Sequence, residues 1–178
     1  QGLVENNKKN YISNNYIKIK NIKRSLEMGL IDKINEKYKV SIKEKDNNAI
    51  NTLRLIKSVI KDKEIELRSK QEKLLDKDIL TLLQNMIKQR KDSIEAFAKA
   101  NRSDLIVKEE NELLVIEKFL PQQLSEEKIK EIIAKIIDEK NLSSLKDMGK
   151  LMTIIKTNYV GKIDMGVAGK IAKSSLGN

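Results

Sequence analysis

Six lysines near the C-terminal end are the residues in this sequence best placed to contact an anionic ligand. Three of them fall on one predicted helix, and one follows Gly161 in a predicted exposed turn just before the last helix. A helix N-terminus attracts anions because its first backbone N–H groups have no partner in the helix. Lysines that neutralise phosphates supply much of the affinity for a nucleic-acid backbone. The predicted phosphate contacts are Lys146, Lys150, Lys156, Lys162, Lys170 and Lys173.

Residues for covalent or acid–base catalysis are sparse. The 178-residue chain has no histidine and no cysteine, which excludes a Ser-His-Asp triad, thiol catalysis, disulfides and zinc–thiolate sites. It has no glycine-rich phosphate loop and no GxSxG motif. The carboxylates, including those from Glu109 to Glu112, lie among lysines at helical spacing, as solvated ion pairs do. We therefore predict no catalytic residue, no bound metal and no cofactor.

An enzyme that works through lysines and carboxylates is the weakest of three functional hypotheses. A deep pocket in which Arg54, Arg90 and an acidic side chain converge on a bound ligand would support it. Arg90 falls on the apolar face of a predicted helix, where a cation needs a carboxylate partner or must reach water. We interpret Arg90 as one half of a structural ion pair rather than as a ligand contact.

The composition indicates a helical protein. Hydrophobic residues make up 39% of the chain and charged residues 35%, which fits apolar stripes with charged outer faces. Turn signals are rare, because Pro121 is the only proline and all-β folds need turn residues every ~8–12 positions. No stretch approaches the ~18–20 apolar residues of a membrane-spanning helix. We predict an all-α fold with no membrane span, and we expect no secretory signal peptide.

The chain has a formal net charge of +10, and its positive charge is densest in residues 1–29, the head of the chain. Residues 1–29 carry six basic and two acidic groups, whereas the longer segments 30–120 and 121–178 each carry a net charge of +3. This excess favours anionic partners such as RNA or a membrane surface, with a solvated Lys/Glu surface as the alternative. Residues 1–24 form a basic, Asn/Lys-rich segment, either a species-specific insertion or the remnant of an organelle-targeting leader. Gln1 and Gly2 match the scar of a cleavable tag.

The sequence of residues 25–120 predicts a domain of four helices. Apolar residues recur at helical spacing, and short polar residues that favour N-caps precede three of the segments. The first helix is expected to bury one stripe, formed by Leu30, Ile34, Tyr38 and Ile42 with Ile31 beside it. The expected helices, with their N-caps, are 26–45, 47–68 (Asp46), 77–100 (Asp76) and 104–119 (Ser103).

A second domain of three helices is predicted over residues 121–178. The residue before a proline avoids the helical region, so the pair Leu120–Pro121 marks the boundary. Ser125, Ser144 and Asp164 are expected to open the three helices, with Asp147 completing a capping box. Gly149 and Gly169 are interpreted as positions where small residues let helices pack closely.

Three stretches, in order, resemble the YqeY-like family over about residues 30–176. They are Thr52–Lys57 continuing to Glu66, Met86–Ile94 continuing to Leu105, and Phe119–Ser125 followed by Lys146–Met152. Residues 1–29 depart from the family pattern. The motif positions include Arg54, Lys57, Lys88, Gln89, Arg90, Pro121 and Gly149.

The resemblance implies a binding role. The family is related to the C-terminal tail of the B subunit of the tRNA-dependent amidotransferase, a glutamine-dependent carbon–nitrogen ligase that amidates misacylated tRNA. In that subunit the tail helps to hold tRNA, and nothing in this chain resembles the catalytic body that precedes it. We therefore predict a non-catalytic tRNA- or RNA-associated accessory protein, with the amidotransferase or another protein as a possible partner. The alternative is a helical protein-interaction adaptor with no nucleic-acid role. The expected compartment is the cytoplasm, or an organelle if the head is a leader remnant.

Overall fold

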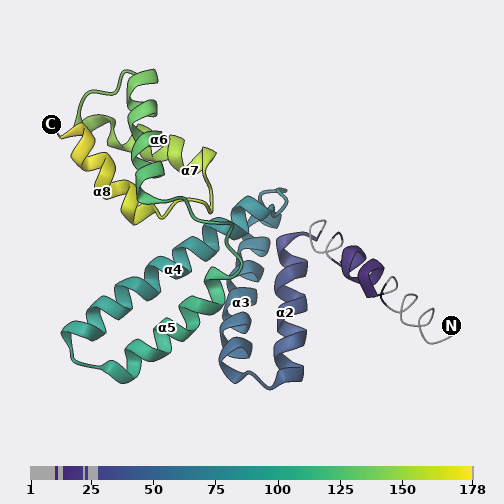
Figure 1. The fold of residues 1–178 in the computed structure, drawn as a ribbon. Helices are drawn as coiled ribbons and strands as arrows, with labels where there is room; N and C mark the ends of the chain where they lie inside the picture. Colours follow the sequence, from purple (N-terminus) through teal and green to yellow (C-terminus); the bar gives the residue numbers. More distant parts are fainter. Residues whose placement is uncertain (1–10, 12–13, 22, 24–27, 178) are drawn as a thin grey trace.

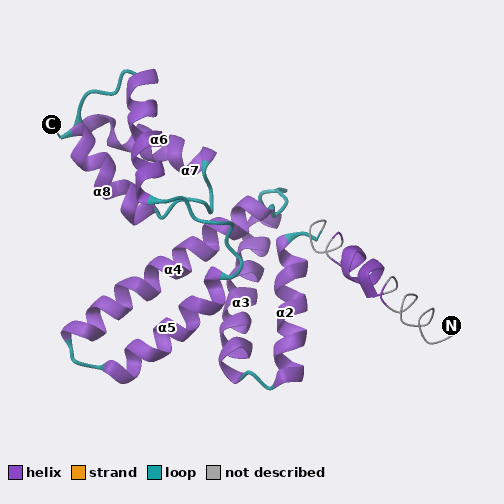
Figure 2. Cartoon of the chain, viewed as in Figure 1, coloured by secondary structure: helices purple, strands orange, loops and turns teal. Residues whose placement is uncertain are grey.

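The computed structural model describes residues 11, 14–21, 23 and 28–177, and these contain helices but no strand. The predicted all-α fold is confirmed (Figures 1 and 2). The interpretations of residues 1–24 as a leader, an insertion or a tag scar fall largely outside this range. The elements are α2 (Leu30–Glu44), α3 (Asn47–Ser69), α4 (Asp76–Lys99), α5 (Ser103–Glu117), α6 (Glu126–Glu139), the short 3₁₀ helix η1 (Leu145–Asp147), α7 (Met148–Asn158) and α8 (Met165–Leu176).

Most of the helix starts predicted from cap residues are confirmed. The side chains of Asp46, Ser125 and Asp164 accept hydrogen bonds from backbone N–H groups in the first turns of α3, α6 and α8. Ser144 and Asp147 form the predicted capping box at η1, which leads into α7. Each cap satisfies backbone donors that the helix itself cannot pair, which contributes about 1 kcal/mol.

Two predicted caps are wrong. Both carboxylate oxygens of Asp76 lie 3.2 Å from the backbone nitrogen of Leu30, so Asp76 caps the distant helix α2. Its own helix α4 is opened instead by Asp78, whose carboxylate accepts a backbone N–H at 2.9 Å. Ser103 is the first residue of α5 and makes no capping hydrogen bond, and the N-cap position belongs to Arg102.

Helix α2 differs from its prediction at its start and in the face that it buries. It begins at Leu30, later than the sequence pattern suggests. Leu30 and Ile34 are buried as expected, but Ile31 is 40% exposed and Ile42 is 48% exposed. The buried position near the end of the helix is Ser41. The neighbouring helices therefore cover a narrower strip of α2 than its apolar residues occupy.

Two hydrophobic cores organise the molecule. We call helices α2–α5 the N-terminal bundle and helices α6–α8 with η1 the C-terminal cluster. In the bundle, α2 lies beside α3 and α4 beside α5 (Figure 1). The bundle core includes Ile34, Leu53, Ile56, Ile79, Leu83 and Ile116, and the cluster core includes Ile133, Leu151, Ile155, Ile163, Ala168 and Ala172. The predicted boundary at Leu120–Pro121 lies between the residues of these two cores, and the division into two domains stays a prediction.

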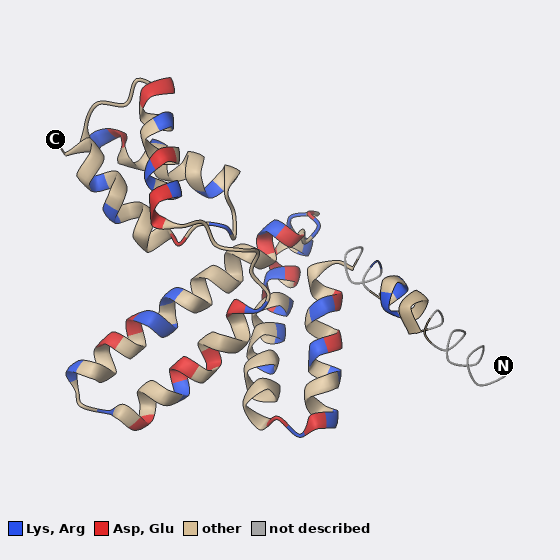
Figure 3. Cartoon of the chain, in the orientation of Figure 1, with Lys and Arg blue, Asp and Glu red and all other residues tan. Residues whose placement is uncertain are grey.

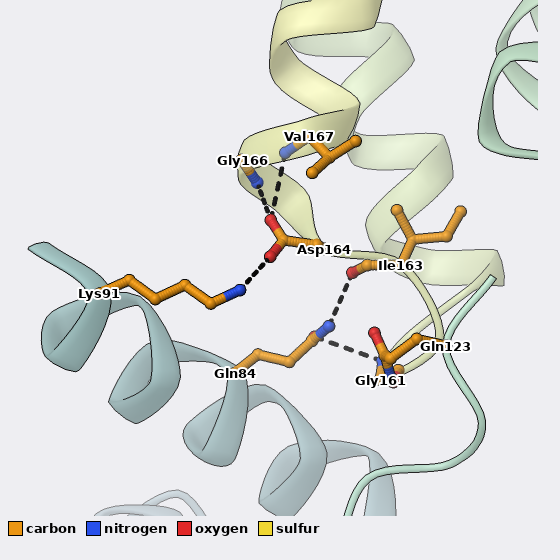
Figure 4. A network of polar contacts seen from close by, with 8 residues as sticks. All are labelled: Gln84, Lys91, Gln123, Gly161, Ile163, Asp164, Gly166 and Val167. Atoms are coloured by element: carbon orange, nitrogen blue, oxygen red, sulfur yellow. Dashed lines mark hydrogen bonds and ion pairs between the residues drawn. The ribbon is translucent and has the colours of Figure 1, made fainter. Parts of the chain in front are cut away.

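The C-terminal cluster docks on α4 through a short series of polar contacts (Figure 4). The amide of Gln84 donates to the carbonyl of Ile163 at 2.9 Å and accepts from the backbone nitrogen of Gly161 at 3.3 Å. Nζ of Lys91 pairs with Oδ2 of Asp164 at 2.7 Å. Partial burial acts to raise the pKa of Asp164, but the hydrogen bonds from Lys91 and from the first turn of α8 hold it below its usual value. One carboxylate thus caps α8 and joins the two parts.

The turn at Gly161 is buried, so its prediction as an exposed turn is wrong. Gly161 has φ +75°, a left-handed conformation that favours glycine. A Cβ on this residue would lie 3.1 Å from Leu80 of α4 and 3.3 Å from Pro121. Gln123 donates to the Gly161 carbonyl at 2.6 Å. The chain therefore needs a glycine here to bring the two parts together, while the next residue, Lys162, remains exposed.

Within the described residues, no helix combines the length and the apolar content that crossing a membrane requires.

Candidate nucleic-acid interface

Charge is divided unevenly within the C-terminal cluster (Figure 3). Helix α6 carries five acidic residues and three lysines, whereas residues 140–178 carry seven lysines and only two aspartates, a net charge of +5. The three α6 lysines form ion pairs along their own helix. Helices α7 and α8 contain no acidic residue. The positive charge therefore lies mainly on residues 145–176, which comprise η1, α7, the turn before α8 and α8, and which we call the basic surface.

Both aspartates of the basic surface are engaged by the backbone. Asp147 accepts hydrogen bonds from the backbone nitrogens of Ser143 and Ser144 at 2.9 and 3.1 Å. These bonds are the main reason that the pKa of Asp147 lies below its usual value. Asp164 caps α8 and pairs with Lys91. Neither carboxylate pairs with a lysine of the basic surface.

All six lysines predicted to contact phosphates are exposed, and none of them forms an ion pair with another described residue. The structure does not gather them at one point. Lys170 and Lys173 line a shallow hollow of about 510 Å³ beside Leu145, the residue that precedes Lys146. The remaining three are Lys150 and Lys156 on α7 and Lys162 in the turn before α8. This arrangement suits an extended anion better than a small one.

Lys162 borders a groove at the joint between the N-terminal bundle and the C-terminal cluster. The groove has a volume of about 640 Å³, and its lysines are Lys33, Lys118 and Lys162. None of these three forms an ion pair with another described residue. Its apolar lining comes from Leu30, Leu80, Phe119, Leu120, Pro121 and Val160. Sequence reasoning missed Lys33 and Lys118 because they join the groove only when the two parts dock.

Arg90 has the structural role expected of it. Its Nη2 lies 2.8 Å from Oε2 of Glu112 on α5, and the two side chains are only 12% and 13% exposed. The other motif residues of α4 face outward: Lys88 is exposed and paired along its own helix, and Gln89 is exposed. Neither of the two hollows described above is lined by Arg54 or Arg90. These two hollows therefore add no support to the catalytic hypothesis.

The packing interpretation of Gly149 is wrong. This glycine lies in the first turn of α7, is exposed, and a Cβ built on it meets no other atom within 4 Å. A Cβ on Gly169 would lie 3.9 Å from the end of Met152, an ordinary contact. Packing therefore does not require glycine at either position.

Among the residues that the structure describes, no three His, Cys, Asp or Glu side chains are grouped to hold a metal ion.

Comparison with known proteins gives one family. The model of the family described as Yqey-like protein matches residues 31–176. The altered inheritance of mitochondria protein 41, mitochondrial, of Lachancea thermotolerans is 46% identical over 79 residues, which cover 44% of this chain and 41% of that protein. The protein of the same name from Kluyveromyces lactis is 36% identical over 125 residues, covering 67% of this chain and 61% of its own length. That from Vanderwaltozyma polyspora is 36% identical over 131 residues, covering 74% and 67%.

Proposed function

The chain belongs to the Yqey-like protein family, and on this premise we propose that it is a non-catalytic accessory protein that binds RNA, with tRNA as the first candidate. The observation that carries the proposal is the basic surface, where six exposed lysines form no ion pair with a described residue while both aspartates are held by caps. The relation of the family to the tRNA-holding tail of an amidotransferase supports tRNA in particular. No ligase activity is proposed for the chain alone.

The lysines would act on phosphates rather than on bases. Each lysine that neutralises a phosphate releases condensed counterions, and this favours binding most at low salt. Residues 140–178 contain a single aromatic residue, Tyr159, so stacking of unpaired bases would contribute little. We expect recognition of the RNA backbone, with log K falling by about 0.7–0.9 per contact for each unit of log[salt].

The test is a titration of fluorescently labelled tRNA at several KCl concentrations. We compare wild type with two triple variants of equal charge change. One replaces Lys146, Lys150 and Lys156 with Gln. Its control replaces the three paired lysines of α6, also with Gln; these are Lys128, Lys130 and Lys135.

The first variant should bind tRNA at least tenfold more weakly at low salt and show a salt slope smaller by about two to three, while the control changes affinity about twofold. Absence of binding at low salt, or binding independent of salt, refutes the proposal. Equal weakening by both variants also contradicts it, because net charge rather than the basic surface would then set the affinity.

The second candidate function is a protein-interaction adaptor, and the groove at the joint favours it. The groove has a largely apolar lining with three lysines, and its one carboxylate, Asp76, is engaged by the backbone nitrogen of Leu30. This lining suits an acidic segment that carries apolar side chains, and a subunit of the amidotransferase is one candidate partner. A pull-down after nuclease treatment tests this function. Partners that persist with wild type and are lost with Lys33→Glu and Lys118→Glu together support it, and partners that disappear with nuclease alone count against it.

We also propose that the protein acts in an organelle. The support is that relatives in three yeasts are named as mitochondrial proteins, and the basic head of this chain fits an organellar leader remnant. Imaging of the protein with a fluorescent tag at its C-terminus tests this. Fluorescence spread evenly through the cytoplasm would contradict it.

A further inference from the structure

Three side chains on the outer side of the α2–α3 pair form a cluster of hydrogen-bond donors. Nε of Arg54 donates to the hydroxyl oxygen of Tyr38 at 3.2 Å. Nζ of Lys57 lies 4.6 Å from the centre of the Tyr38 ring. Tyr38 belongs to α2, and the two cations lie one turn apart on α3, which runs beside it (Figure 1). The tyrosine therefore holds both cations on one side of the bundle.

The donors of this cluster are largely unused. Nε is the only Arg54 nitrogen with a hydrogen bond among the described residues, so its two Nη groups stay available. The Tyr38 oxygen accepts from Arg54, which leaves its own O–H proton free to be donated. Lys57 has no hydrogen-bond acceptor and no ion pair in the described part of the chain. The cluster thus offers free donors from three side chains, and the described residues supply no acceptor for these free donors.

Along α3, no carboxylate lies one turn from either cation. The helical neighbours of Arg54 at positions 50, 51, 57 and 58, and those of Lys57 at positions 53, 54, 60 and 61, include no acidic residue. Farther along the same helix, lysines are paired: Lys61 with Glu64 at 2.9 Å and Lys63 with Glu66 at 2.8 Å. Two like charges one turn apart repel each other, and an anion from outside would relieve that repulsion.

We propose that Tyr38, Arg54 and Lys57 form a phosphate-binding site on the N-terminal bundle. A phosphate group presents several oxygens in a tetrahedral arrangement and accepts hydrogen bonds from separate donors at once. The guanidinium supplies a planar fork, the ammonium a point charge, and the tyrosine a single neutral donor. The phosphate comes either from an RNA backbone or from a small phosphate-bearing molecule. The site is independent of the basic surface and does not rest on its proposed function.

The test is a titration of the ¹⁵N-labelled protein with inorganic phosphate, compared with chloride at matched ionic strength, while the Arg54 Nε–Hε signal is followed by NMR. Phosphate should shift this signal along a saturating curve, whereas chloride should shift it weakly and without saturation. Lys57→Gln and Tyr38→Phe should each weaken the phosphate response at least threefold. Lys88→Gln serves as the control, because Lys88 is an exposed cation already paired with Asp92 at 2.6 Å, and it should leave the response unchanged.

Equal responses to phosphate and chloride overturn the proposal, as does a saturating response that survives the combined Lys57→Gln and Tyr38→Phe changes. Folding of each variant is checked by its thermal melt, and Tyr38→Phe keeps the ring that packs against Lys57. The source of the phosphate is then assigned with labelled tRNA. Arg54→Gln with Lys57→Gln should lower tRNA affinity about fivefold or more, and the salt slope by about one to two, if RNA is the source. An unchanged tRNA affinity beside a saturating phosphate titration assigns the site to a small phosphate-bearing molecule.

Discussion

Removing Glu112 should leave the guanidinium of Arg90 buried without its carboxylate. The paired atoms lie 2.8 Å apart, and both side chains are largely shielded from water. Among the described residues, the only other hydrogen bond of Arg90 is a weak one to the carbonyl of Met86 at 3.4 Å. Breaking a fully buried ion pair costs about 3–5 kcal/mol. Because a little over a tenth of each side chain still meets solvent, we expect Glu112→Ala to lower the free energy of unfolding by about 2–3 kcal/mol.

Replacing both partners should be far less harmful. Arg90→Met with Glu112→Leu removes the pair and leaves apolar side chains of similar size, so the double variant should lie within about 1 kcal/mol of wild type. Urea unfolding followed by far-UV circular dichroism measures all the variants. Arg90→Met, Glu112→Leu and their combination complete a double-mutant cycle with wild type. Lys88→Ala is the control, because its exposed pair should contribute about 0.5 kcal/mol or less. A cost below about 1 kcal/mol for Glu112→Ala, or a double variant as unstable as the single one, would refute this account of Arg90.

Three further predictions follow from single residues. Gly161→Ala should lower stability by about 1–3 kcal/mol in thermal melts, because it places a Cβ on a left-handed residue against Leu80. An unchanged melting temperature would contradict the claim that this turn needs a glycine. Gly149→Ala should raise stability by up to about 1 kcal/mol, because the added Cβ meets open space in a helix; a loss of stability would contradict this. The lowered pKa of Asp164 means that its carboxylate stabilises the fold above its unfolded pKa of about 3.9, and that this contribution is lost as pH falls through the lower folded value. Asp164→Asn should therefore destabilise the protein near neutral pH, and this effect should shrink as pH falls below about 3.9. An effect in urea titrations that does not change with pH would contradict the role given to the pairing of Asp164 with Lys91.

The sequence predicts well the features that depend on a few neighbouring residues. Asp46, Ser125 and Asp164 cap their helices as expected, because the acceptor and the backbone donors that it satisfies lie within three residues of each other. The buried partner of Arg90 was also expected, because an arginine on an apolar face must find a carboxylate or water. Its identity as Glu112 was not, since that requires knowing how α4 and α5 pack.

Features that depend on distant contacts escaped prediction. The residue type and position of Asp76 predict a cap for its own helix. Its carboxylate instead accepts from the backbone nitrogen of Leu30, 46 residues earlier in the chain. Ile42 fits the apolar stripe of α2, yet it remains 48% exposed. The groove lysines and the burial of Gly161 depend on how the two parts dock, and local spacing carries no information about that. The cluster of Tyr38, Arg54 and Lys57 could have been suspected from two cations on one face of a helix without an acid nearby, but the tyrosine belongs to another helix.

The double use of Asp164 bears on the order in which the chain folds. Its Oδ1 holds the first turn of α8 while its Oδ2 meets Lys91, 73 residues earlier in the chain. The side chain is fixed in the direction of Lys91 only once that first turn has formed. Closing so long a loop costs entropy that a few polar contacts can offset only when they are already oriented. We expect the C-terminal cluster to be assembled before it meets the bundle, so that docking is a late step and mutations at Gln84 or Lys91 mainly speed unfolding.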